Sequence, residues 1–157
     1  MLRSRAYGSG VRWAFRPART SHASTAVSPA FDWEAWARRF EAVEGPEAFA
    51  ELFADGGVFC DPVTPWTTDV HKVARDTDAL FPDWAQQVDR IRGGDDWAVF
   101  EWTGTGTFTV DGHQGVPIRM QGATVIEVDA DGKVMSWRDY LDTNEPMQQI
   151  KAGLEGG

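Results

Sequence analysis

Four strand-like runs in the C-terminal half constrain the fold of this chain more than any other feature. Apolar and polar residues alternate within them, and they cover residues 84–92, 97–110, 117–129 and 133–142. Asp111-Gly112 and Asp131-Gly132 separate the later runs, and Asp-Gly between alternating runs favours a tight hairpin turn. The sequence therefore predicts an antiparallel meander of about four strands.

Three helical segments and one short strand precede this meander. The first helix has its apolar residues on one face, at Trp33, Trp36, Ala37, Phe40 and Val43. The second begins at Pro46, with Phe49, Leu52 and Phe53 on its apolar face, and ends at Gly56-Gly57. A short strand is predicted at 57–61, and the third helix runs from Asp69 to Pro82. Helices gathered on one face of an antiparallel sheet predict an α+β domain, here residues 31–153.

Residues 1–30 differ in composition from the rest of the chain. They hold five arginines and no acidic residue or lysine, and are rich in Ser, Ala and Gly. Such a composition is typical of an organelle transit peptide, and the alternatives are a disordered tail or translation read from a spurious upstream start. We therefore expect a cytoplasmic protein, or a mitochondrial matrix protein if this segment is a transit peptide.

The charge and the apolar runs exclude several classes of function. Residues 31–157 hold 10 basic and 24 acidic residues, a net charge of −14, which opposes nucleic-acid binding. No apolar run approaches the roughly 18 residues of a membrane helix. Cys60 is the only cysteine, and the three histidines lack ligand spacing, so we predict no metal site.

Strand alternation places two acids on apolar faces. Phe100, Trp102, Gly104, Gly106 and Phe108 share the side of their strand that should face the helices, and the two glycines leave space there. In the last strand, Asp139 shares a side with Met135, Trp137 and Leu141. In the short strand, Asp61 shares a side with Phe59.

Two motifs carry a resemblance to a known superfamily. LFADGGVFCDPVTP (52–65) and GKVMSWRDYLD (132–142) resemble the nuclear transport factor 2-like superfamily, which includes ketosteroid isomerases, limonene epoxide hydrolases and SnoaL-like polyketide cyclases. The resemblance covers roughly residues 32–152 and is closest to the SnoaL-like and limonene epoxide hydrolase-like branch. It implies a cone-shaped, cystatin-like fold, in which a curved antiparallel sheet wraps around three N-terminal helices and encloses a deep apolar pocket.

The resemblance also implies the roles of two aspartates. Asp61 matches the general base of the isomerases, and Asp139 matches the acid/base aspartate of the epoxide hydrolases and SnoaL-type cyclases. Other functional positions differ: Thr124 stands where the isomerases have a second Asp, and Trp102 and Gly104 stand where the epoxide hydrolases have an Arg and an Asp.

We therefore predict a cofactor-independent acid/base enzyme, a cyclase, isomerase or hydrolase, that acts on a small hydrophobic molecule. Desolvation in an apolar pocket would raise the pKa of Asp139 or Asp61 toward neutral. The predicted pocket wall and substrate-binding residues are Trp36, Phe40, Phe59, Trp102, Met120, Thr124 and Trp137.

Structural explanations compete with this functional one. Asp61 precedes Pro62 and can cap the following turn, and Asp139 can be satisfied by an indole N–H or by Arg119. The chain would then be a non-catalytic ligand-binding or dimerisation module of the same fold. In either case the resemblance implies a homodimer through the convex sheet face, which carries Thr103, Thr105, Thr107 and Thr109.

Overall fold

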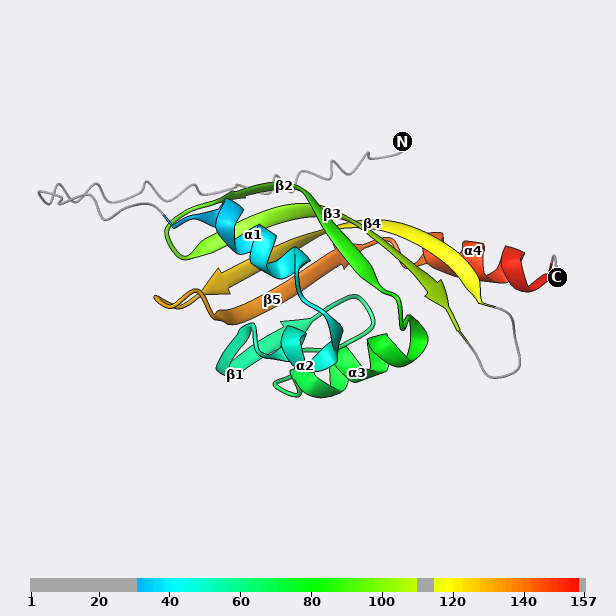
Figure 1. Ribbon diagram of the computed structural model, residues 1–157, viewed down its shortest axis with the longest axis horizontal. Coiled ribbons are helices and arrows are strands. Elements are labelled where there is room, and N and C mark those ends of the chain that lie inside the picture. The colour runs from blue at the N-terminus through cyan, green and yellow to red at the C-terminus, as the bar shows by residue number, and fades with distance from the viewer. Residues whose placement is uncertain (1–30, 110–114, 156–157) are drawn as a thin grey trace, which may run out of the picture.

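The chain folds into four helices and five strands over the residues that the computed structural model describes, 31–109 and 115–155. In chain order they are α1 (Trp33–Glu41), α2 (Gly45–Ala50), β1 (Phe53–Cys60), α3 (Val70–Leu80), β2 (Ala85–Gly93), β3 (Trp97–Phe108), β4 (Val116–Val128), β5 (Val134–Leu141) and α4 (Asn144–Glu155) (Figure 1). The predicted leader, 1–30, and the predicted turn at Asp111-Gly112 lie outside the described residues. Within them, no helix has the length and apolar character needed to span a membrane.

The five strands form one curved, unclosed sheet in the order β1-β5-β4-β3-β2. Strands β2 to β5 pair antiparallel, as the meander predicts, and Thr124 of β4 lies between Phe100 of β3 and Asp139 of β5. The predicted α+β class is confirmed. The expectation of a wholly antiparallel sheet is wrong at one edge, because β1 pairs parallel with β5. These two strands are not consecutive in the chain, so no hairpin turn requires them to run antiparallel.

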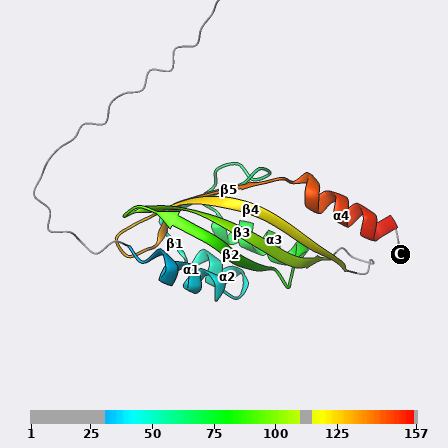
Figure 2. The ribbon, with the colours of Figure 1, turned by 90° about the horizontal axis from the view of Figure 1, so that it is seen from above.

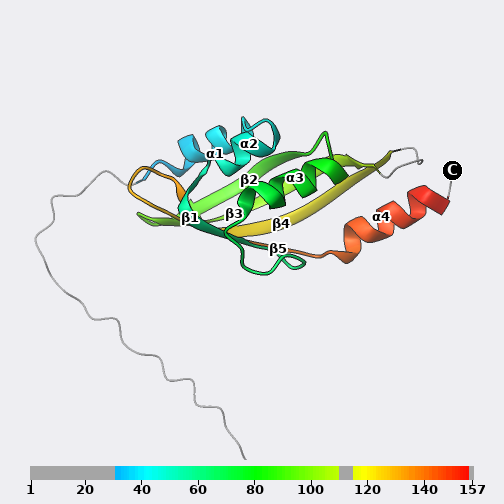
Figure 3. The same cartoon turned by 90° about the horizontal axis from the view of Figure 1, so that it is seen from below.

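An aromatic cluster holds α1 and α2 against the sheet. Trp36 of α1 stacks on Phe40, with ring centroids 5.7 Å apart, and both rings contact Trp137 of β5 and Phe100 of β3. Phe49 of α2 meets Trp137 edge to face at 5.5 Å. Figures 1 and 3 show α1, α2 and α3 grouped beside the sheet, with α4 beyond its far end. The core therefore lies between the first three helices and the sheet face that carries Phe100 and Trp137.

Two predicted residue placements are wrong for local reasons. Phe53 belongs to β1 and not to the second helix, because α2 ends at Ala50. Met135 is exposed while Trp137 is buried, because the β4–β5 register shifts beside Val128 and breaks the alternation of β5. A β-bulge of this kind turns one side chain to the opposite face.

Helix α4 was not predicted from the sequence and lies beside β4 at the end of the sheet (Figure 2). The β4–β5 pairing stops at Gly122 and Leu141, so the first residues of β4 have a free edge on that side. Gln149 of α4 pairs with this edge: its side-chain oxygen accepts from the Arg119 N–H at 2.8 Å, and its side-chain amide donates to the Arg119 carbonyl at 2.7 Å.

Candidate functional site

Asp139 lies partly buried on β5, on the same side of the strand as Trp137. Its Oδ1 atom accepts two hydrogen bonds, one from the Trp137 indole at 2.8 Å and one from the Thr124 hydroxyl at 2.5 Å. The predicted indole partner of Asp139 is therefore Trp137. Arg119, the other predicted partner, instead directs its guanidinium toward Thr103.

Thr124 connects Asp139 to a second tryptophan. Its side chain is 0% exposed, and its hydroxyl oxygen accepts a 2.8 Å hydrogen bond from the indole N–H of Trp102. Gly122, opposite Trp102 in the sheet, makes this position possible, since a Cβ atom there would lie 2.4 Å from the Trp102 ring. The sequence singles out Trp102 and Thr124 as departures from the family pattern, and the structure joins both to Asp139.

Burial raises the pKa of Asp139 from 3.8 to about 7. The hydrogen bonds from Thr124 and Trp137 act in the opposite direction, because they stabilise the carboxylate. The negative charge of Asp61 adds a smaller upward contribution. At neutral pH Asp139 is therefore present in both its protonated and its charged form.

Asp61 follows the last residue of β1, and its side chain caps the turn after this strand. Its Oδ1 atom accepts from the N–H groups of Val63, at 2.8 Å, and Thr64, at 2.5 Å. The predicted turn-capping role of Asp61 is thus confirmed. In the parallel β1–β5 pairing Cys60 lies opposite Arg138, so Asp61 and Asp139 are the residues that follow this pair on neighbouring segments.

The other predicted wall residues lie in the aromatic cluster around Trp137. Phe59 stacks on Trp137 at 6.5 Å, Trp36 and Phe40 also contact its ring, and Met120 is buried in the same core.

Trp84 was not predicted as part of this region. Its ring lies over Gly104 and Gly106 and meets Trp102 edge to face. The space that the two glycines were expected to leave therefore holds the indole ring of Trp84. The spacing of the two glycines was the only sequence signal for this contact.

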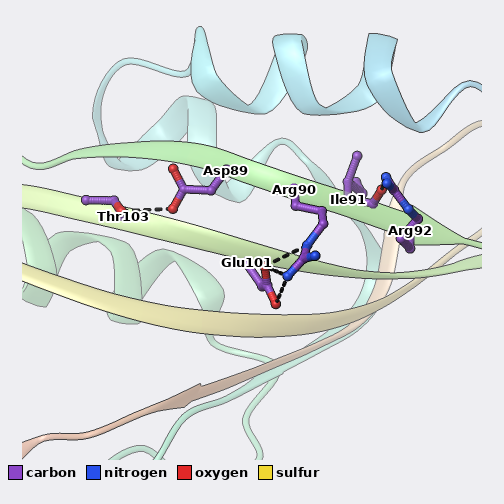
Figure 4. Close-up of polar contacts among 6 residues, drawn as sticks. All are labelled: Asp89, Arg90, Ile91, Arg92, Glu101 and Thr103. Atoms are coloured by element: carbon purple, nitrogen blue, oxygen red, sulfur yellow. Dashed lines mark hydrogen bonds and ion pairs between the residues drawn. The ribbon is translucent and has the colours of Figure 1, made fainter.

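Two surface hollows lie away from Asp139. The first, about 420 Å³, lies between α1 and β2, and its lining includes Arg38, Glu41 and Arg90. Figure 4 shows the polar contacts along its β2 side, where Arg90 pairs with Glu101 and Asp89 accepts from Thr103. The second, about 280 Å³, lies beside Phe31 and Gly132. The apolar pocket predicted around Asp139 stays a prediction.

The arrangement around Asp139 suits proton transfer. A carboxyl group with a pKa near 7 can donate a proton to a carbonyl, hydroxyl or epoxide oxygen, or remove one from carbon or water. Among residues 31–109 and 115–155, no three His, Cys, Asp or Glu side chains converge as metal ligands.

Comparison with solved structures supports the fold. A protein of ketosteroid isomerase-like fold from Catenulispora acidiphila, in complex with trimethylamine, is 20% identical, with a TM-score of 0.62 over 74% of this chain and 89% of that one. A candidate polyketide cyclase from Acidithiobacillus ferrooxidans is 22% identical, with a TM-score of 0.61 over 77% and 92%. An epoxide hydrolase of M. tuberculosis that resembles limonene epoxide hydrolase is 17% identical, with a TM-score of 0.57 over 79% and 90%.

Sequence comparison identifies the family. No curated protein matches the chain. The profile of the SnoaL-like domain, however, matches residues 33–137, which run from α1 through β4 and reach Trp137 of β5, two residues before Asp139. The solved structures that share the fold include a candidate polyketide cyclase and an epoxide hydrolase, and this agrees with the fold that the two sequence motifs imply. This chain belongs to the SnoaL-like domain family.

Proposed function

We propose that this protein is a cofactor-independent enzyme that transfers protons to or from a small hydrophobic molecule, with Asp139 as the acid/base. The observation that supports the proposal is the buried setting of Asp139, which raises its pKa to about 7 while Thr124 and Trp137 hold one of its oxygens in place. A group with its pKa near the working pH transfers protons most efficiently in both directions.

Asp61 is the second acid in the proposal. Its charge favours the protonated form of Asp139, because ionising one carboxyl group opposes ionising the other. An Asp139 that has taken a proton from the substrate would then return it to another atom of the same molecule. This chemistry fits ring closure, isomerisation next to a carbonyl, and epoxide opening.

The test measures proton exchange on defined probes. Hydrophobic cyclic ketones and β-keto esters, incubated with the protein in D₂O, would show deuterium uptake at the carbon next to the carbonyl by NMR. We expect Asp139→Asn to slow the uptake about 10²-fold or more. Asp131→Asn, which removes an exposed carboxylate in the β4–β5 turn, should leave it unchanged. Equal rates for Asp139→Asn and the unaltered protein would refute the role of Asp139.

A non-catalytic ligand-binding or dimerisation module remains the second candidate. It is favoured by the tight burial of Trp102, 3% exposed, and Trp137, 1% exposed, whose indole N–H groups donate to Thr124 and to Asp139, respectively. This candidate predicts that a probe binds without deuterium uptake. A measurable exchange rate that depends on Asp139 would exclude it.

We further propose that the protein is a homodimer that contacts its partner through the outer sheet face. Exposed Trp97 and Val99 of β3 and Tyr140 of β5 support this proposal. For its location we propose the cytoplasm, or the mitochondrial matrix if residues 1–30 act as a transit peptide.

A further inference from the structure

The hydrogen bonds from Trp102 through Thr124 to Asp139 can run in one direction only. An indole nitrogen donates and never accepts, so the 2.8 Å contact between Trp102 and Thr124 makes the Thr124 oxygen an acceptor. The single proton of that hydroxyl is then free for another acceptor. The acceptor within reach is Oδ1 of Asp139, at 2.5 Å.

The opposite direction would leave a buried proton without a partner. If Oδ1 of Asp139 carried a proton and donated it to Thr124, the Thr124 oxygen would accept twice and its own proton would lose its acceptor. Thr124 is 0% exposed, so water could not replace that acceptor. An unsatisfied buried donor is strongly unfavourable.

A second hydrogen-bond donor to Oδ1 supports the same direction of the hydrogen bonds. Trp137 donates to the same oxygen at 2.8 Å, so two fixed N–H and O–H groups point at Oδ1 from β4 and β5. We propose that Trp102 and Thr124 form a one-way hydrogen-bond relay that commits Oδ1 of Asp139 to accepting, so that Oδ2 is the atom that carries the exchangeable proton.

The relay gives two residues a defined role at the proposed site. Thr124 touches Asp139, and Trp102 acts on it only through Thr124, so both are positioning residues. Their place in turnover rests on the proposed function, whereas their effect on the protonation of Asp139 does not. Gly122 belongs to the same device, because any side chain there would displace the Trp102 ring.

The test follows the Asp139 carboxyl through a pH titration by ¹³C NMR of the full chain. Thr124→Val removes a hydrogen bond to the charged form, so the pKa of Asp139 should rise by about 1. Thr124→Ser keeps the hydroxyl and should leave the pKa unchanged. Trp102→Phe should also raise the pKa, although the altered side chain does not touch Asp139, because Thr124 could then accept from a protonated Oδ1.

The double variant separates a relay from two independent effects. Because Trp102 acts only through Thr124, Trp102→Phe combined with Thr124→Val should give the same pKa as Thr124→Val alone. Trp84→Phe alters a ring that packs on Trp102 but not the relay, so it is the matched control and should leave the pKa unchanged. Additive shifts, or no shift in Trp102→Phe, would overturn the proposal.

Two further outcomes keep the test decisive. If Trp102→Phe does not fold, the comparison of Thr124→Val with Thr124→Ser decides, and equal pKa values in these two variants would overturn the relay. If the pKa values follow the relay but Asp139→Asn exchanges protons on the ketone probes as fast as the unaltered protein, the relay stands and the proposed function fails.

Discussion

At the scale of single residues, the carboxyl group of Asp139 links folding stability to pH. Its pKa rises from 3.8 to about 7 on folding, so between these values the folded protein holds a proton that the unfolded chain has lost. Stability should therefore fall as the pH rises through this window. The loss is complete above pH 7 and amounts to at most about 4 kcal/mol, at roughly 1.4 kcal/mol per pKa unit.

Asp139→Asn should remove this pH dependence, because the amide does not titrate and its oxygen can still accept from Thr124 and Trp137. The measurement is urea unfolding of both proteins at pH 5 and pH 8. We expect the variant to gain stability relative to the unaltered protein as the pH rises, since the other titrating groups cancel in the comparison. A stability difference that is the same at both pH values would contradict a raised pKa.

The sequence placed individual residues well where alternation within one strand was enough. It predicted that Asp139 shares a side with Trp137, and their hydrogen bond confirms this. It could not predict the contact between Thr124 and Asp139, because that contact depends on the register between β4 and β5, which shifts at a bulge. The contact between Trp102 and Thr124 depends in addition on the register between β3 and β4, which alternation within one strand does not predict either.

At the scale of the elements, Gln149 should determine how firmly α4 stays on the sheet. Its side chain makes two hydrogen bonds to the backbone of Arg119. Gln149→Ala removes both, so we expect a loss of about 1–2 kcal/mol in the free energy of unfolding, and faster hydrogen exchange at the Arg119 amide. Gln148→Ala, at an exposed position of the same helix, is the control. Equal hydrogen-exchange rates at the Arg119 amide in the two variants would mean that Gln149 does not attach α4 to the free edge of β4.

The elements that the sequence missed lack a local signal. Pro146 is the only buried residue of α4, and Ile150 is partly buried against the core, so the apolar face of this helix is too small to stand out in the sequence. The side-chain amide of Gln149 also attaches the helix to β4. The parallel pairing of β1 with β5 joins segments that are distant in the chain. Hairpin turns predict neighbours only between consecutive strands, and this is why β2 to β5 were predicted correctly.

At the scale of the whole molecule, the outer sheet face should mediate dimerisation. Trp97 and Val99 of β3 are 47% and 37% exposed and form a short apolar strip on the outer face of the sheet. The polar residues Glu101 and Thr105 continue the same face of the strand beyond this strip. An apolar strip on the face opposite the helices is a surface that a second copy can cover through two-fold symmetry. The sequence anticipated this face from strand alternation, whereas its use as an interface follows only from the family resemblance.

A charge placed in this strip should separate the dimer. Val99→Asp would bury an unpaired carboxylate at the interface, twice in a symmetric dimer, at a cost of several kcal/mol. Leu80→Asp introduces the same group at a similarly exposed apolar position of α3, away from the outer sheet face, and should leave the dimer intact. In sedimentation velocity runs at equal concentrations, we expect the unaltered protein and Leu80→Asp at twice the mass of one chain and Val99→Asp at the mass of one. A monomeric unaltered protein would show that this face mediates no dimer. A Val99→Asp variant that still dimerises would show that the interface lies elsewhere, because two unpaired carboxylates buried against each other would separate a dimer formed through this face.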